Sequence, residues 1–259
     1  MIDELIALAL APLLLAQGWR ARRLAQHLPE AAGARTGSCG AGTAVLRVLL
    51  VGDSAVAGVG VATQEQALAG QLARKLHDAL PATVIAWRVV ARSGVTTREA
   101  LAMLAAEEPE QFDLAVVALG VNDVTALVSV GAWLARIGQL VEQLRGNWGV
   151  RQIWLSGLPP MHRFPLLPQP LRWFLGRRAR RFSGALGAWA AARPGLRYVA
   201  LPDMTDPTLI AADGFHPGLG AVAIWAQELA AAMASQAAPG SRPASPAASS
   251  PRHSDSPLS

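Results

Sequence analysis

Cysteine, lysine and tyrosine are nearly absent from this chain of 259 residues, which contains one of each. With Cys39 alone, neither a disulfide framework nor a thiolate metal site can form within the chain. With Lys75 alone, the net charge of +5 depends on arginine. Proteins that bind single-stranded nucleic acid interleave such cations with stacking aromatic side chains, but aromatic residues make up only 5% of this sequence. The composition therefore indicates no nucleic-acid partner.

Long hydrophobic runs are also lacking, except within an apolar N-terminal segment of residues 1–29. Residues 5–16 are continuously apolar, but Asp3 and Glu4 precede them, whereas a cleaved secretory signal begins with positive charge. The run is shorter than the roughly 17 to 25 residues that a spanning helix needs, although residues 17–19 extend it towards an interface. Three arginines follow, at positions 20, 22 and 23.

Two interpretations of this segment stay open. If residues 5–19 anchor the protein, the positive-inside rule keeps the arginines and the domain behind them on the cytoplasmic side of the membrane. Otherwise the segment is an apolar helix that packs on the domain or on a partner chain. In both cases we expect a cytoplasmic protein, and in the first it contacts the inner face of the membrane.

The rest of the sequence divides into a connector, one domain and a tail. Residues 30–44, rich in Gly, Ala, Ser and Thr, predict a connector. Residues 45–237 alternate strand-like apolar runs with helical stretches, which is typical of a parallel sheet covered on both faces. Residues 238–259 are dominated by Pro, Ser and Ala without periodicity and predict disorder. The expected strands are Val45–Val51, Thr83–Val90, Leu114–Leu119, Ile153–Leu158 and Tyr198–Leu201.

Helix starts and apolar stripes complete this pattern. Thr63 with Gln66 forms a capping-box sequence that predicts the start of a helix with a leucine at every fourth position, and Thr96 with Glu99 repeats the device. Further helices are expected over residues 127–144, from a stripe spaced by three and four, and over the alanine-rich residues 221–234.

Residues 161–182 depart from the alternation. A proline-rich loop leads into Trp173 and Phe174, and four arginines follow within residues 177–181. One interpretation is a lid or acyl-chain site that touches lipid with its aromatics and phosphate with its cations. The other is an ordinary helix with a buried stripe from Leu171 to Trp189 and arginines on its solvent-exposed face. We favour the second for the stripe and leave the loop open.

Ser54, Asp213 and His216 occur in a pattern that suits nucleophilic catalysis. Ser54 follows the buried-strand run of residues 48–51, so it is expected at a strand's carboxyl end, where open α/β sheets place their sites. A serine hydroxyl becomes a good nucleophile when an imidazole takes its proton and an acid orients that imidazole. Asp213 and His216 supply both groups within one turn of chain.

Two more segments follow strands: Ser93-Gly94 and Gly120-Val121-Asn122-Asp123. With all four blocks present in order, residues 45 to 235 resemble the SGNH hydrolase (GDSL esterase/lipase) family. The resemblance implies an α/β fold, a three-layer α/β/α sandwich with a five-stranded parallel sheet in flavodoxin-like order. Ala55 departs from the family pattern, because many members carry leucine there, and this leaves the chemistry intact.

The resemblance also implies roles for individual residues. Ser54 is the nucleophile, and His216 with Asp213 completes the catalytic triad. The backbone N–H groups of Ser54 and Gly94 and the side-chain amide of Asn122 form the oxyanion hole. No metal and no other cofactor is implied.

Each motif alone has an ordinary structural explanation. Gly-Asp-Ser is usually a turn, Asp123 is a plausible helix cap, and the Asp213–Pro217 segment is a turn ended by proline. We interpret Asp53 and Asp123 as structural. Of the other histidines, only His162 competes with His216, and it lacks a nearby acid.

The expected function is a serine esterase that hydrolyses acyl esters, with lipid-like esters of the lysophospholipase type favoured. An acyl-CoA thioesterase or a carbohydrate acetylesterase on the same site stays open. An inactive, membrane-associated scaffold is the alternative of another class, and the intact motifs argue against it. The sequence argues against a dinucleotide loop, because Thr63 stands where the third glycine after Gly58 and Gly60 belongs.

Overall fold

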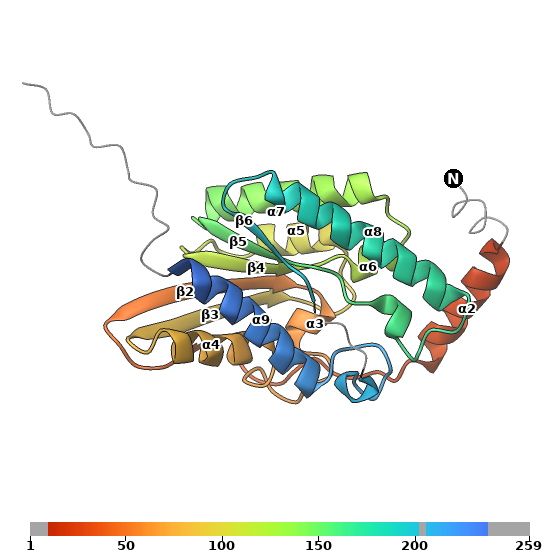
Figure 1. The fold of residues 1–259 in the computed structure, drawn as a ribbon, viewed down its shortest axis with the longest axis horizontal. Coiled ribbons are helices and arrows are strands. Elements are labelled where there is room, and N and C mark those ends of the chain that lie inside the picture. Colours follow the sequence, from red (N-terminus) through yellow and green to blue (C-terminus); the bar gives the residue numbers. More distant parts are fainter. Residues whose placement is uncertain (1–9, 202–205, 238–259) are drawn as a thin grey trace, which may run out of the picture.

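The centre of the computed structural model, which describes residues 10–201 and 206–237, is a six-stranded sheet (Figure 1). Its parallel strands run in the order β3-β2-β4-β5-β6, which is the flavodoxin-like order, second-first-third-fourth-fifth along the chain. The predicted three-layer fold is therefore confirmed. These strands are β2 (Ala44–Gly52), β3 (Thr83–Ala91), β4 (Leu114–Ala118), β5 (Gln152–Ser156) and β6 (Leu196–Val199).

The sixth strand was not expected from the sequence. β1 (Thr36–Cys39) lies within the predicted connector and pairs antiparallel with β3 at the edge of the sheet. Its sequence, TGSC, carries no apolar alternation, because an edge strand of four residues with no fully buried side chain needs none. The predicted tail, residues 238–259, and the first part of the N-terminal run, residues 1–9, lie outside the described residues.

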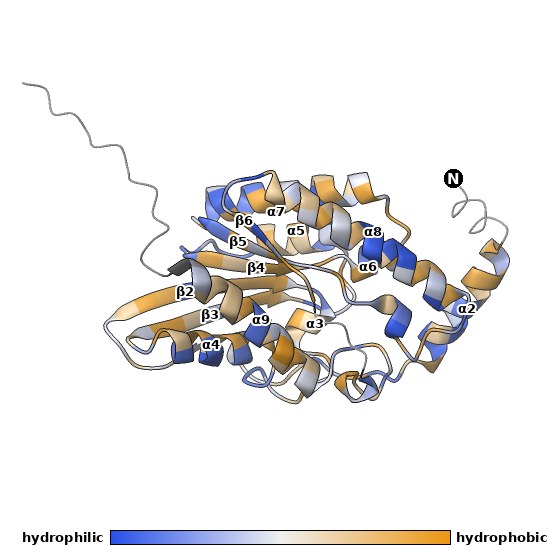
Figure 2. Ribbon diagram, viewed as in Figure 1, coloured by the Kyte–Doolittle hydropathy of each residue, from blue (hydrophilic) through white to orange (hydrophobic). Residues whose placement is uncertain are grey.

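Helices cover both faces of the sheet (Figure 1). Side chains alternate along β2, so Leu49 and Val51 join the core beneath one layer, while Val48 and Leu50 join the core beneath the other. The strands at the centre of the sheet, β2 and β4, are mainly hydrophobic (Figure 2). The first layer contains α5 (Thr97–Ala105), α7 (Val130–Asn147) and α8 (Leu171–Ala191); the second contains α4 (Leu68–Ala79) and α9 (Leu219–Ala237).

The two predicted capping boxes have different outcomes. At Thr96 the box is present, and Glu99 Oε2 accepts a hydrogen bond from Thr96 N at 2.8 Å. At Thr63 the prediction is wrong, because α4 begins only at Leu68. Gln64 is fully buried, and its side-chain amide donates to the carbonyl oxygens of Ala31 and Ala57, both at 3.1 Å. These long-range bonds hold the segment in a turn ahead of the helix.

The described part of the N-terminal segment forms α2 (Ala11–Leu24), which packs against α8. Gln17 Nε2 donates to Gln169 O at 2.7 Å, Gln17 Oε1 accepts from Leu171 N at 3.1 Å, and Leu14 and Ala21 are buried. Among the described residues, no helix has the length and apolar character needed to cross a bilayer.

Helix α8 has the buried stripe that the sequence predicted. Leu171, Leu175, Phe182 and Leu186 are buried, while Trp189 is half-buried. Helix α7 starts later than predicted, at Val130, because Leu127 is exposed and adopts a φ of 58° that a helix cannot continue. The short helices are α3 (Ser54–Ala57), α6 (Val121–Thr125), η1 (Met161–Arg163) and η2 (Pro207–Leu209).

Candidate active site

Ser54 lies where β2 ends and α3 begins. Asp53 caps this one-turn helix, since its Oδ1 accepts a hydrogen bond from Ala55 N at 3.1 Å. Gly52 is required for close packing, because a Cβ atom there would stand 2.2 Å from Val56 Cγ2 and 2.9 Å from Ala118 O. The sharp junction fixes the Ser54 side chain, of which only a small part is exposed, at the carboxyl edge of the sheet.

His216 lies next to Ser54 although 162 residues separate them in the sequence. His216 Nε2 and Ser54 Oγ are 2.9 Å apart, and His216 Nδ1 bonds to Asp213 Oδ2. The other carboxylate oxygen of Asp213 accepts from the backbone N–H groups of Phe215 and His216, both at 3.0 Å. Because the carboxylate holds the proton at Nδ1, Nε2 is the nitrogen that can accept a proton from the serine hydroxyl.

The two buried aspartates near Ser54 have opposite pKa shifts. Burial works to raise the pKa of the Asp213 carboxyl, but hydrogen bonds from the His216 side chain and from two backbone N–H groups outweigh it and lower that pKa below its usual range. Burial raises the pKa of the Asp53 carboxyl to about 7, with a further contribution from the nearby charge of Asp123. Asp213 is therefore ionised at neutral pH, while Asp53 is only partly so.

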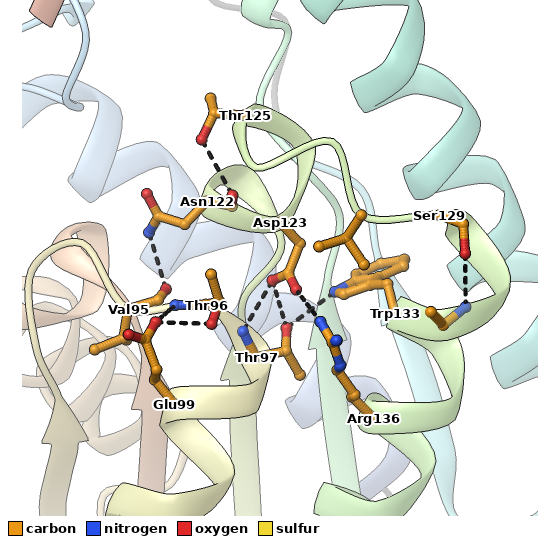
Figure 3. Close-up of polar contacts among 12 residues, drawn as sticks. Val95, Thr96, Thr97, Glu99, Asn122, Asp123, Thr125, Ser129, Trp133 and Arg136 are labelled. Carbon is orange, nitrogen blue, oxygen red and sulfur yellow. Dashed lines mark hydrogen bonds and ion pairs between the residues drawn. The ribbon is translucent and has the colours of Figure 1, made fainter.

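Gly94 and Asn122 lie on neighbouring segments, and a hydrogen bond of the Asn122 side chain helps to connect them. Gly94 follows β3 with a φ of 79°, in the left-handed region that glycine adopts without strain. Asn122 is the second residue of α6, and its Nδ2 donates to Val95 O at 2.9 Å (Figure 3). That bond uses one of the two N–H donors of the amide and orients the other.

A cavity of about 60 Å³ opens beside Ser54 and His216. Its walls are almost entirely apolar, and the sequence did not reveal most of them, because they come from several segments that are far apart in the chain. The proline-rich loop contributes Phe164, whose ring lies 4.9 Å from the ring of Phe215. The apolar lining residues are Ala55, Ala118, Leu119, Val121, Leu158, Pro159, Phe164, Leu201, Phe215, Pro217 and Trp225.

The loop also supports the histidine segment directly. Leu166 N donates to Gly214 O at 3.2 Å, and the ring of Phe215 lies 5.3 Å from that of His216. The part of the 161–182 stretch that the sequence left open is therefore a wall of the cavity. The only signal in the sequence was the pair of aromatic residues, one in the loop and one beside His216.

The competing sequence interpretations fit the structure poorly. His162 lies in η1 with its Nδ1 3.2 Å from Arg180 Nη1, so it faces α8 while His216 faces Ser54. A Cβ atom on Gly58 would meet Ala31 Cβ at 2.5 Å, and one on Gly60 would meet Pro217 O at 2.5 Å. Protein atoms therefore occupy the space beside these glycines in which the phosphates of a dinucleotide would have to lie. Within residues 10–201 and 206–237, no three metal-ligating side chains are gathered to hold an ion.

Comparison with known proteins identifies the family. The profile of the GDSL-like Lipase/Acylhydrolase family matches residues 50–219, more than half of the chain. A GDSL-like esterase of Mycobacterium tuberculosis is 27% identical over 202 residues, which cover 73% of this chain and 62% of that protein. The chain thus spans less than two thirds of the length of this relative.

Solved structures agree on the fold. A lipase from a goat rumen metagenome superimposes with a TM-score of 0.60 at 19% identity, over 72% of this chain and 97% of that one. A carbohydrate acetylesterase from Sinorhizobium meliloti has a TM-score of 0.53 at 20% identity, over 73% and 99%. TesA has a TM-score of 0.53 at 25% identity, over 71% and 95%. The match of the family profile shows that the chain belongs to the GDSL-like lipase/acylhydrolase family.

Proposed function

We propose that the protein is a serine esterase in which Ser54, His216 and Asp213 form the catalytic triad. The observation that carries the proposal is the 2.9 Å contact between Ser54 Oγ and His216 Nε2, with Asp213 bonded to the other ring nitrogen. Ser54 Oγ attacks the acyl carbon while His216 takes its proton. His216 then returns the proton to the leaving alcohol, and a water activated by the same imidazole releases the acyl group.

The negative charge of the tetrahedral intermediate needs donors in fixed positions. We assign this role to the N–H groups of Ser54 and Gly94 and to the side-chain amide of Asn122. Two features support the assignment. Ser54 is the first residue of α3, and the first N–H groups of a helix have no partner within it. Asn122 is bonded to the segment that follows Gly94, so the two donors share one support.

The apolar cavity favours an apolar acyl group, as in lipid-like esters. A single water needs about 10 to 15 Å³ of such space, so about 60 Å³ admits only the first few carbon atoms of a chain. Acyl-CoA thioesters fit the same cavity, because the acyl group that enters it is the same in a thioester as in an ester. An acetyl group on a sugar would leave most of the apolar wall unused, which makes a carbohydrate acetylesterase the weaker alternative.

A series of acyl esters tests this assignment. Each buried methylene contributes about 0.8 kcal/mol, so kcat/KM for p-nitrophenyl butanoate is expected to exceed that for the acetate by about tenfold. The measurement compares p-nitrophenyl esters of increasing length with acyl-CoAs, lysophospholipids and acetylated sugars. Faster turnover of acetyl sugars than of butanoyl esters would contradict the lipid-like assignment.

We also propose that the exposed face of α2 contacts the cytoplasmic surface of a membrane. Leu13, Leu15, Trp19 and Leu24 are between 46% and 68% exposed, which is unusual for such side chains on one helix. Hydrophobic and hydrophilic turns lie next to one another along α2 (Figure 2). Arg20, Arg22 and Arg23 are also exposed and suit anionic headgroups.

The position of α2 connects this contact to the proposed chemistry. The helix lies beyond the carboxyl ends of the strands, on the side of the molecule where α3 begins (Figure 1). A membrane on that face would bring lipid-like substrates towards Ser54.

Replacing Leu15 and Trp19 together with glutamine tests the membrane contact. Both side chains are exposed, so the fold and turnover of a soluble ester should persist, while co-sedimentation with anionic vesicles is expected to fall about tenfold or more. The matched control replaces Val45 and Leu219, which are 53% and 50% exposed on other elements. Equal sedimentation of the two double variants would rule out a specific role for α2.

A further inference from the structure

A buried polar cluster joins the two segments that carry Gly94 and Asn122. At its centre is Asp123, whose side chain is completely buried in α6. Asp123 Oδ2 accepts two hydrogen bonds from one residue of α5, at 2.9 Å from Thr97 N and at 2.8 Å from Thr97 Oγ1 (Figure 3). The sequence predicted that Asp123 is a local helix cap, whereas its side chain bonds to Thr97 of α5 and Arg136 of α7.

The cluster extends into α7. Thr97 Oγ1 accepts from Trp133 Nε1 at 3.1 Å, and Arg136 Nη1 lies 3.4 Å from Asp123 Oδ1. Thr97 and Trp133 are fully buried. A buried carboxylate is costly unless hydrogen bonds and a counter-charge compensate it. Apolar residues of similar size would fill this space at a lower free-energy cost of burial, so stability alone does not account for the cluster.

The contacts of neighbouring residues suggest what the cluster does. Asn122 Nδ2 bonds to Val95 O, and the next residue, Asp123, bonds to Thr97, which lies two residues beyond Val95. Residues 95–97 and 122–123 are therefore joined by two adjacent connections (Figure 3). One connection involves a proposed oxyanion donor itself, and the other involves a buried charge that contacts neither the cavity nor Ser54.

We propose that Asp123 and Thr97 form a positioning clamp, which sets the distance between the Gly94 and Asn122 donors. This inference rests on the proposed function, because it concerns the donors assigned there. Oxyanion donors act at 2.7 to 3.1 Å from the developing charge, so a small displacement of either segment is costly. Hydrogen bonds to an ionised carboxylate are shorter and stronger than neutral ones, which suits a fixed spacing.

The structure explains why α6 needs such a clamp. The helix has only five residues, so it has little packing surface of its own. Its other end is held in a similar way, since Arg178 donates to Val124 O at 3.4 Å and to Val128 O at 2.7 Å. The clamp and Arg178 together fix both ends of the helix that carries Asn122.

Thr97→Val and Thr97→Ser test the clamp as a pair. Valine keeps the shape of threonine but loses the hydroxyl, whereas serine keeps the hydroxyl. Thr97→Val is expected to lower kcat about 10- to 100-fold with KM changed less than about threefold, and Thr97→Ser to stay within about threefold of the parent. Leu144→Val, in the distant half of α7, is the control for a loss of core stability.

Affinity for a transition-state analogue distinguishes a positioning role from a merely structural one, because a structural role would leave this affinity unchanged. Affinity for a boronic acid inhibitor should fall with Thr97→Val by about the same factor as kcat/KM, while affinity for a non-reactive substrate analogue stays constant. If Thr97→Val does not fold, Asp123→Asn, which keeps the shape and one carbonyl oxygen, is expected to lower kcat about tenfold.

Two outcomes separate the clamp from the proposed function. If the parent is labelled at Ser54 by a fluorophosphonate, and the clamp variant loses no more kcat than Leu144→Val, the positioning role is wrong and the esterase assignment stands. If the parent is neither labelled nor active on any ester, the assignment of the donors fails, and the clamp fails with it.

Discussion

Replacing Ser54 with alanine is expected to leave the fold intact and to lower kcat by about four to six orders of magnitude. The side chain is small and largely buried at the first turn of α3, so alanine fits the same space. What is lost is the oxygen that stands 2.9 Å from His216 Nε2. Without a nucleophile, the covalent route closes, and only the weak catalysis by the remaining groups persists.

Steady-state kinetics and covalent labelling measure this effect. A fluorophosphonate probe should label the parent protein but not the Ser54→Ala variant. The matched control is Ser235→Ala, which removes an exposed serine on α9 and should leave both readouts unchanged. Undiminished labelling of Ser54→Ala would mean that another residue is the nucleophile.

The second large effect is expected at Asn122. Its amide is proposed to bind the substrate oxygen as negative charge develops, so Asn122→Ala should lower kcat by about two to three orders of magnitude with little change in KM. The structure adds a second consequence, because the variant also loses the 2.9 Å bond to Val95 O that ties α6 to the Gly94 segment.

Kinetics over a range of substrate concentrations separates the two parameters. The control is Asn147→Ala, at the exposed carboxyl end of α7, which should behave as the parent does. A change confined to KM would show that Asn122 binds the ground state of the substrate and is not an oxyanion donor.

Local patterns predicted four of the five parallel strands well, because each of these is an apolar run long enough to stand out from its flanking segments. The fifth, β6, has the sequence LRYV and lies two residues before the predicted Tyr198–Leu201. Local patterns failed where long-range contacts decided the outcome. β1 carries no strand pattern and exists because β3 offers an edge to pair with. The start of α4 shifted to Leu68 because Gln64 bonds to carbonyl groups of residues 31 and 57.

The candidate site shows the same division. Three of the four motifs were recognisable because each follows a strand, and the carboxyl ends of parallel strands meet at one edge of the sheet. The Asp213–His216 motif lies well after β6 and was recognisable from its spacing of acid and imidazole. The lining of the cavity could not be recognised from the sequence, since Leu158, Phe164, Phe215 and Trp225 come from separate segments. Asp123 was interpreted as a local cap, and only the packing of α5 against α6 and α7 revealed its bonds to Thr97.

The sequence by itself therefore determined the layer architecture, the strand order implied by family resemblance, and the residues that stand at strand ends. The layers and the strand ends depend on hydrophobic periodicity and on short motifs, both of which are local, whereas the strand order was implied by the resemblance alone. The tertiary structure alone decided that Ser54 and His216 meet at 2.9 Å, that the cavity beside them is apolar, and that Asp123 is buried between helices. Such features depend on contacts between side chains far apart in the chain, and no local pattern encodes those distances.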